Sequence, residues 1–280
     1  MTEKTERILG LHVALFDEGK GRLLLLVHGG GSKLDWRANV EPLSRRFRVV
    51  APDLPGFGRS EKPERDYTFL FYDEFLEQLV QDVGEAKIAL VGHSMGGFLA
   101  ARFAAAHPDL VERLILVAPM GFGPEIHPAI RLMQVPVIGA LLGRPSPAGT
   151  RRLLETLIAK RELVTDDLVR ETFELQSQPG AARAFASIFG KLVRPIRGVV
   201  ARIPESIASL GPRTMVVWGS ADALIPCRHL DVARERLPGG RFEVFEGCGH
   251  FPQLEDPERF DAALTDFLAD GAARDVATKA

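Results

Sequence analysis

Cysteine is scarce in this chain, since only Cys227 and Cys248 occur among its 280 residues. Two cysteines cannot form the disulfide framework of a small secreted protein, and their number fits a reducing compartment better. An excess of charge of either sign is also lacking, because the formal net charge is −2. No strong overall field favours nucleic acid or an anionic membrane surface, so we expect neither as a partner.

Long hydrophobic runs are missing as well. The first ten residues, MTEKTERILG, are charged and contain no signal-peptide core. The longest purely apolar run near the start, Leu23–Val27, is far too short to span a bilayer. We therefore expect a cytoplasmic protein without stable membrane anchoring. The sequence does not determine the oligomeric state and leaves a homodimer open.

What the chain does contain is a repeated alternation of short apolar runs and helical patterns. Several runs are apolar throughout, as expected for parallel strands that are buried on both faces. Apolar residues at helical spacing fill two of the intervals, Tyr72–Val83 and Gly96–His107. This order predicts an α/β fold, with an open, mostly parallel sheet and helices on both faces. The predicted strands are Leu23–Val27, Arg48–Ala51, Lys87–Val91, Leu114–Val117, Thr214–Trp218 and Phe242–Phe245.

The alternation stops in the segment 121–199. This segment begins with glycines and prolines, and it becomes helical from Ala148 to Phe189 without a strand pattern. We interpret it as a helical cap, or lid, that is inserted over the carboxyl edge of the sheet. Residues 1–120 and 200–280 then form the core. The alternative is a set of extra packing helices remote from any site.

The strongest chemical signal is the run KIALVGHSMGGFLA, in which a predicted strand leads through Gly92, Ser94 and Gly96 into a helix. A G-x-S-x-G sequence in this setting is a nucleophile elbow. Its serine occupies a strained turn, and the flanking glycines let the strand and the helix approach each other. A glycine-rich phosphate loop is the alternative, but such loops usually have more glycines or a lysine. We predict that Ser94 is a nucleophile.

A serine hydroxyl requires a base, and the base requires an acid that orients it. His250 follows the last predicted strand, in GCGHFPQLEDP, and Asp222 follows the strand before it, in WGSAD. Both therefore fall at the carboxyl edge of the sheet, where Ser94 lies, and the chain order Ser, Asp, His is a known order of this triad. Asp53 also follows a strand but precedes the serine, and we interpret it as a residue that organises its turn.

Three successive glycines follow His28 in the segment VHGGGS. Glycines leave their backbone N–H groups unobstructed, as an oxyanion hole requires. We assign the hole to the N–H groups of Gly30 and Met95, since Met95 begins the helix whose N-terminal dipole points toward the serine. His28 is expected to brace the loop by hydrogen bonding rather than to take part in the chemistry.

Together these motifs make the chain resemble the α/β-hydrolases over nearly its whole length. HGGG, DLPGFGRS, GHSMGG, WGSAD and GCGHFPQLEDPERF occur in the order typical of that superfamily. The resemblance implies an α/β-hydrolase core around a variable cap and a mechanism without metal or cofactor. It says much less about the substrate.

Within the superfamily, VHGGGS and SMGG look like the carbon–carbon bond hydrolases that cleave vinylogous diketones, the meta-cleavage products of aromatic rings. Three positions depart from the pattern of those enzymes. His93 replaces an asparagine, Phe251 replaces a tryptophan, and Thr172 stands where a cap arginine would hold the substrate carboxylate. Arg170 would face elsewhere on its helix. Haloalkane dehalogenases and epoxide hydrolases are similar around DLPGFGRS, but their nucleophile is an aspartate.

We therefore expect a serine hydrolase that cleaves a small to medium apolar carboxylic ester through an acyl-enzyme. The carbon–carbon hydrolase is the alternative, and a non-hydrolytic enzyme such as a lyase or perhydrolase also stays open. A receptor that keeps only the fold would not need an intact triad. The apolar stretch 126–142 is interrupted by prolines and would either line a pocket or pack the cap onto the core. The candidate substrate-binding residues are Met133, Val137 and Phe251.

Overall fold

The computed structural model describes residues 1–123, 145–188 and 207–277. Within these ranges the chain forms one eight-stranded sheet with the strand order β1-β2-β4-β3-β5-β6-β7-β8. The strands from β4 across to β8 are parallel, as predicted from their apolar runs. The strands are β1 (Glu3–Ile8), β2 (Leu11–Glu18), β3 (Leu23–Val27), β4 (Arg48–Pro52), β5 (Ile88–His93), β6 (Val111–Val117), β7 (Thr214–Gly219) and β8 (Arg241–Phe245).

The antiparallel hairpin at the N-terminal edge of the sheet was not predicted from the sequence. β1 pairs with β2 through a two-residue turn at Leu9 and Gly10, whose φ angles of 50° and 74° suit a tight hairpin turn. Five of the six residues of β1 are exposed, so the strand has no apolar face that a pattern would reveal. β2 continues the sheet by antiparallel pairing with β4.

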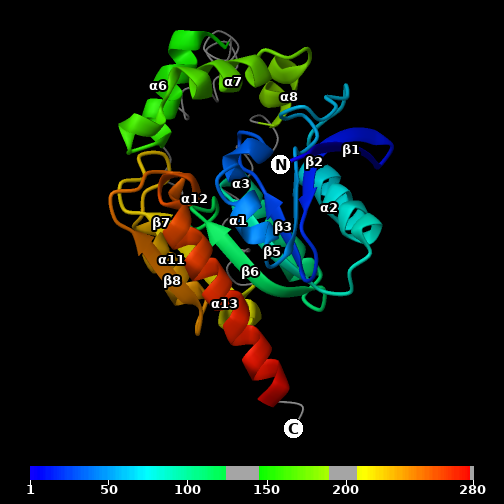
Figure 1. The fold of residues 1–280 in the computed structure, drawn as a ribbon, viewed down its shortest axis with the longest axis vertical. Coiled ribbons are helices and arrows are strands. Elements are labelled where there is room, and N and C mark those ends of the chain that lie inside the picture. The colour runs from blue at the N-terminus through cyan, green and yellow to red at the C-terminus, as the bar shows by residue number, and fades with distance from the viewer. Residues whose placement is uncertain (124–144, 189–206, 278–280) are drawn as a thin grey trace.

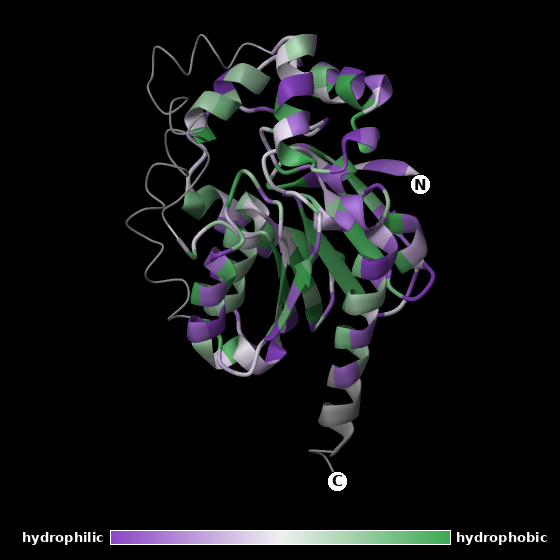
Figure 2. Ribbon diagram, turned by 90° about the vertical axis from the view of Figure 1, so that its left-hand side faces the viewer, coloured by the Kyte–Doolittle hydropathy of each residue, from purple (hydrophilic) through white to green (hydrophobic). Residues whose placement is uncertain are grey.

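Helices cover both faces of the sheet (Figure 1). Alternate residues of β3 belong to two separate apolar clusters, one packed against α2, α3 and α11 and the other against α1 and α13. Figure 2 shows the hydrophobic strands enclosed between these layers. The helices are α1 (Val40–Ser44), α2 (Phe69–Val83), α3 (Met95–Ala106), α6 (Pro147–Leu157), α7 (Asp166–Gln176), α8 (Ala181–Ile188), α11 (His229–Arg236), α12 (Pro252–Glu255) and α13 (Pro257–Ala277), with 3-10 turns η1 (Lys33–Trp36), η2 (Arg161–Leu163) and η4 (Ala208–Arg213).

Helices α6, α7 and α8 lie together at one end of the molecule, beyond the sheet (Figure 1). Serine and threonine caps begin two of them, since Ser146 accepts the N–H of Gly149 and Thr165 accepts that of Leu168. A small apolar cluster joins α6 and α7 to Phe251 of the core. The division into a core and a cap over residues 121–199 stays a prediction, because much of that segment lies outside the described residues.

Among the helices that the structure describes, none combines the length and the apolar character that a membrane crossing would need.

Candidate active site

Ser94 occupies a one-residue turn between the last residue of β5 and the first residue of α3. Its backbone angles, φ 54° and ψ −116°, lie in a region that residues with side chains rarely adopt. A Cβ on Gly92 would lie 2.3 Å from the carbonyl oxygen of Gly96, and a Cβ on Gly96 would lie 2.3 Å from that of His28. The two flanking glycines are therefore required by backbone contact, which is the physical basis of the G-x-S-x-G pattern.

The loops after β7 and β8 bring Asp222 and His250 into contact. Nδ1 of His250 donates to Oδ2 of Asp222 at 2.8 Å, and Oδ1 of Asp222 accepts the N–H groups of Leu224 and Ile225 at 2.8 and 2.9 Å. Because an ionised carboxylate only accepts, this bond keeps the proton of His250 on Nδ1 and leaves the lone pair on Nε2. Nε2 is buried and makes no hydrogen bond to a described residue.

His93, the residue before the serine, is bonded to the loop that carries His250. Its ring lies 4.7 Å from the ring of His250, and its Nε2 donates to the backbone carbonyl oxygen of His250 at 2.8 Å. Burial lowers the pKa of His93 well below its ordinary value, and the neighbouring His250 lowers it further. His93 is thus neutral and does not oppose a positive charge on His250. In the sequence, His93 stands out only as a departure from a related pattern, and this role was not predicted.

The glycine loop after β3 lies beside the elbow. A Cβ on Gly29 would lie 2.9 Å from Cβ of Ser94, whereas one on Gly30 would meet open space. The N–H of Met95 belongs to the first turn of α3, where a helix leaves its N–H groups without helical partners. The structure therefore brings the loop and the helix start to the serine, and the assignment of Gly30 and Met95 as the oxyanion hole stays a prediction.

His28 braces this loop, as the sequence analysis expected. Its Nε2 accepts the N–H of Leu54 at 2.8 Å, and its Nδ1 donates to the carbonyl oxygen of Gly29 at 2.9 Å. Burial, with a smaller contribution from Lys33, lowers the pKa of His28 to about 4, although Asp53 and the carbonyl oxygen of Gly29 oppose the shift. A neutral imidazole with one donor and one acceptor matches these two contacts.

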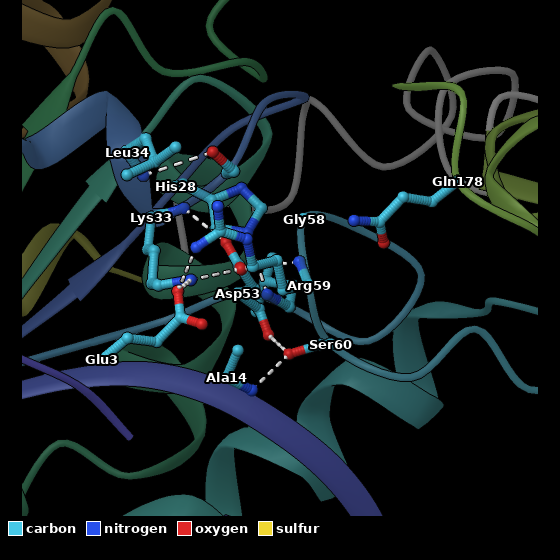
Figure 3. A network of polar contacts seen from close by, with 12 residues as sticks. Glu3, Ala14, His28, Lys33, Leu34, Asp53, Gly58, Arg59, Ser60 and Gln178 are labelled. Atoms are coloured by element: carbon cyan, nitrogen blue, oxygen red, sulfur yellow. Dashed lines mark hydrogen bonds and ion pairs between the residues drawn. The ribbon is translucent and has the colours of Figure 1, made fainter. Parts of the chain in front are cut away.

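A buried ion pair fixes the next residues of the same loop (Figure 3). Nζ of Lys33 lies 2.6 Å from Oδ2 of Asp53 and 2.9 Å from Oε2 of Glu3, and its side chain is 1% exposed. The backbone N–H groups of Lys33 and Arg59 donate to the same Asp53 carboxylate at 2.7 and 2.8 Å. Asp53 therefore organises two loops, and its carboxylate is directed toward Lys33 rather than toward a histidine base. Nothing in the sequence around Lys33 predicts that this lysine is buried.

We expect Lys33→Met to lower the free energy of unfolding by about 3–5 kcal/mol, because it leaves the buried Asp53 without its cation. Urea denaturation measures this change. Arg59→Met is the matched control from the same network, since its pair with Glu3 is 50% and 32% exposed. An exposed pair contributes at most about 1 kcal/mol. Equal effects of the two substitutions would contradict the prediction.

A further carboxyl group, Asp35, lies against the glycine loop. A Cβ on Gly31 would lie only 2.6 and 2.7 Å from the two carboxylate oxygens of Asp35. Burial raises the pKa of Asp35 to about 7, although Arg37 and the N–H of Ser32 oppose the shift.

The candidate substrate-binding residues are only partly placed. Phe251 is buried with its ring 4.6 Å from that of His93 and belongs to the apolar cluster of α6 and α7. This position is next to His250, but whether Phe251 contacts a substrate stays a prediction. Met133 and Val137 lie outside the described residues.

Comparison with known proteins agrees with this geometry. Residues 22–257 match the profile of the family described as alpha/beta hydrolase fold. The chain belongs to this α/β-hydrolase family. Its parallel sheet, its elbow and its carboxyl-edge loops are those predicted from the sequence for that fold.

Several relatives that match along more than nine-tenths of their length are hydrolases. The 2-hydroxymuconate semialdehyde hydrolase of Pseudomonas sp. (strain CF600) is 30% identical, covering 94% of this chain and 93% of that enzyme. The meta-cleavage product hydrolase CumD of Pseudomonas fluorescens IP01 superposes with a TM-score of 0.84 at 28% identity, over 95% of this chain and 97% of that one. A thermophilic esterase of Thermogutta terrifontis gives a TM-score of 0.75 at 26% identity, over 97% and 99%. The chain is a hydrolase, and its relatives include both carbon–carbon bond hydrolases and esterases.

Proposed function

We propose that the chain is a serine hydrolase that cleaves apolar carboxylic esters through an acyl-enzyme, with Ser94, His250 and Asp222 as its triad. The observation that supports this most is the Asp222–His250 pair, in which Nδ1 is bound and Nε2 is left without a partner among the described residues. A base of this kind beside a serine on a strained elbow is the arrangement that activates a hydroxyl.

The reaction follows from these groups. Oγ of Ser94 attacks the ester carbonyl carbon while Nε2 of His250 takes the hydroxyl proton, and Asp222 stabilises the resulting imidazolium. The N–H groups of Gly30 and Met95 donate to the tetrahedral oxyanion, each contributing about 3 kcal/mol to lowering the barrier. His250 then gives its proton to the leaving alcohol oxygen, which leaves an ester on Ser94. Water, deprotonated by the same base, attacks that ester, and the carboxylic acid and free Ser94 are released.

The described cations Lys33, Arg37 and Arg170 bear on whether the substrate carries a carboxylate. Arg37 is bound to Glu171 at 2.6 Å, Arg170 is bound to Asp167 at 2.5 Å on the exposed side of α7, and Lys33 is bound to Asp53. Each of these cations already has an acidic partner, so none of the three is set aside for a substrate carboxylate.

The second candidate is cleavage of a carbon–carbon bond in a meta-cleavage product. It is supported by two of the relatives named above, the 2-hydroxymuconate semialdehyde hydrolase and the meta-cleavage product hydrolase CumD. The same three groups would serve that reaction, since it also needs an activated oxygen nucleophile and a base. The departures at His93, Phe251 and Thr172 and the paired cations place it second.

We also propose that α6, α7 and α8 act as the cap of this site. The end of α6 is bonded to the loop of His250, so these helices stand at the edge where the triad lies. A cap in this place would exclude water and offer an apolar wall to the acyl group, with Met133, Val137 and Phe251 as its proposed residues.

A panel of substrates tests the proposal. p-Nitrophenyl esters of increasing acyl length are assayed beside a dienoate ring-cleavage product. We expect kcat/KM to rise by up to about fourfold per methylene, the rate equivalent of about 0.8 kcal/mol, and to fall once the pocket is full. A dienoate turned over far better than every ester would make carbon–carbon cleavage the function. Ser94→Ala protein, purified in the same way, controls for contaminating esterases.

A further inference from the structure

The loop that carries His250 is bonded directly to the end of α6. The N–H of His250 donates to the carbonyl oxygen of Leu157 at 2.7 Å. A Cβ on Gly249 would lie 2.4 Å from that same oxygen and 2.9 Å from the nitrogen of Ala159. The two backbones are therefore in contact, and glycine at 249 is what permits it.

Glu255 connects these two segments a second time. Its Oε1 accepts the N–H of Gly249 at 2.8 Å, and its Oε2 accepts the N–H groups of Ala159 and Lys160 at 2.9 and 3.0 Å. Nζ of Lys160 donates to the backbone oxygen of Glu255 at 2.7 Å. A residue that is only 4% exposed thus uses one carboxylate oxygen on the His250 loop and the other on the residues that follow α6.

The chemistry of this carboxylate differs from that of a simple ion pair. Burial raises the pKa of Glu255 above its ordinary value, and the N–H groups of Lys160, Gly249 and Ala159 oppose that shift. The donors to its two carboxylate oxygens, at Gly249, Ala159 and Lys160, are backbone N–H groups, which have fixed positions. Such bonds specify where two stretches of backbone lie relative to each other rather than merely how strongly they attract.

We propose that Glu255 is a positioning residue that makes the end of α6 and the His250 loop move as one unit, so that the base is placed only while α6 is docked. The proposal rests on His250 being the base of the proposed triad. If α6 moved away, the loop would lose the bond from the His250 N–H to Leu157, and Oε2 of Glu255 would lose both of its N–H donors. Glu255 would then no longer be fixed where its Oε1 holds the Gly249 N–H. The N–H groups of His250 and Gly249 lie within one residue of the catalytic ring, where a displacement of about 1 Å costs on the order of 100-fold in rate.

Glu255→Gln is the most direct test, because glutamine has nearly the same shape. Its NH2 group would face either the N–H of Gly249 or the N–H groups of Ala159 and Lys160, and none of these can accept a hydrogen bond. With p-nitrophenyl acetate we expect kcat to fall by about 10- to 100-fold and KM to change by less than about threefold. Hydrogen–deuterium exchange, followed by mass spectrometry, should show faster exchange in residues 157–160 and in residues 247–251 together. Glu171→Gln is the matched control, since it removes the charge from the Arg37 contact between α7 and the core and lies in neither segment.

A second pair of variants addresses the same contact from the other side, and it applies even where Glu255→Gln does not fold. Lys160 has φ −77°, which proline also adopts. Lys160→Pro removes the backbone N–H that donates to Glu255, whereas Lys160→Ala removes only the ammonium group. We expect the proline variant to lose more kcat than the alanine variant and to expose residues 247–251 to exchange.

Three results would overturn the proposal. The first is unchanged exchange in both segments. The second is faster exchange in residues 157–160 alone with kcat intact, which would make Glu255 an anchor of α6 and nothing more. The third is opening of both segments without a loss of kcat. The exchange measurement needs no turnover, so it can disprove the coupling between the two segments without bearing on the triad. Kinetics of Ser94→Ala can disprove the triad without bearing on the coupling.

Discussion

Ser94→Ala is expected to abolish turnover, with a fall in kcat of about 10⁶-fold by analogy with the loss of a serine nucleophile in subtilisin. The substitution removes the oxygen that forms the acyl-enzyme, and only binding and oxyanion stabilisation then remain. Alanine keeps a Cβ at the strained φ of 54°, so the elbow itself is not relieved. Steady-state kinetics on the preferred ester measures the loss.

Two measurements accompany this substitution. Thermal unfolding should show a folded protein, and Ser209→Ala, which changes an exposed serine of η4, should keep wild-type activity. A phosphonate inhibitor should label the wild-type protein on the peptide that contains Ser94 and should leave Ser94→Ala unlabelled. An adduct on another serine, or residual activity above a few per cent in contaminant-free protein, would show that Ser94 is not the nucleophile.

The parallel part of the fold was predictable because its strands are buried on both faces. Their sequences are continuous apolar runs, and the structure places each predicted run in a strand, with bounds that differ by at most a few residues. β1 was not predictable in this way. It is an edge strand paired on one side with exposed polar side chains, so its stability comes from backbone pairing with β2 and not from a hydrophobic pattern.

The residues of the candidate site also fall into those that could be predicted from the sequence and those that could not. Ser94, Asp222 and His250 each follow a parallel strand, and the carboxyl ends of such strands meet at one edge, so their proximity could be inferred from order alone. Lys33, His93 and Glu255 act through partners that lie 20, 157 and up to 96 residues away in the sequence. A contact of that kind depends on how loops pack, which local residue patterns do not encode.

Asp222→Asn is expected to lower kcat by about 10⁴-fold while the protein keeps its fold. The reason is that the two carboxylate oxygens of Asp222 have different partners. Oδ1 accepts the N–H groups of Leu224 and Ile225, so the amide oxygen of asparagine will take that side and its NH2 will face His250. Nδ1 of His250 must then accept, which moves the proton to Nε2 and removes the lone pair that takes the proton of Ser94.

Asp231→Asn controls for the loss of a negative charge near the same loop, because Asp231 is an exposed residue of α11 that pairs with Arg234. We expect its kcat to stay close to that of the wild type. The pH dependence distinguishes a tautomer effect from a general loss of structure. Hydroxide can deprotonate the serine without Nε2, so the activity of Asp222→Asn should rise with pH above the range where the wild-type rate is constant. A fall in kcat of less than about tenfold would mean that Asp222 does not orient the base. Asp53→Asn would then be the next variant to measure, although the Asp53 carboxylate already accepts both the backbone N–H and the ammonium group of Lys33.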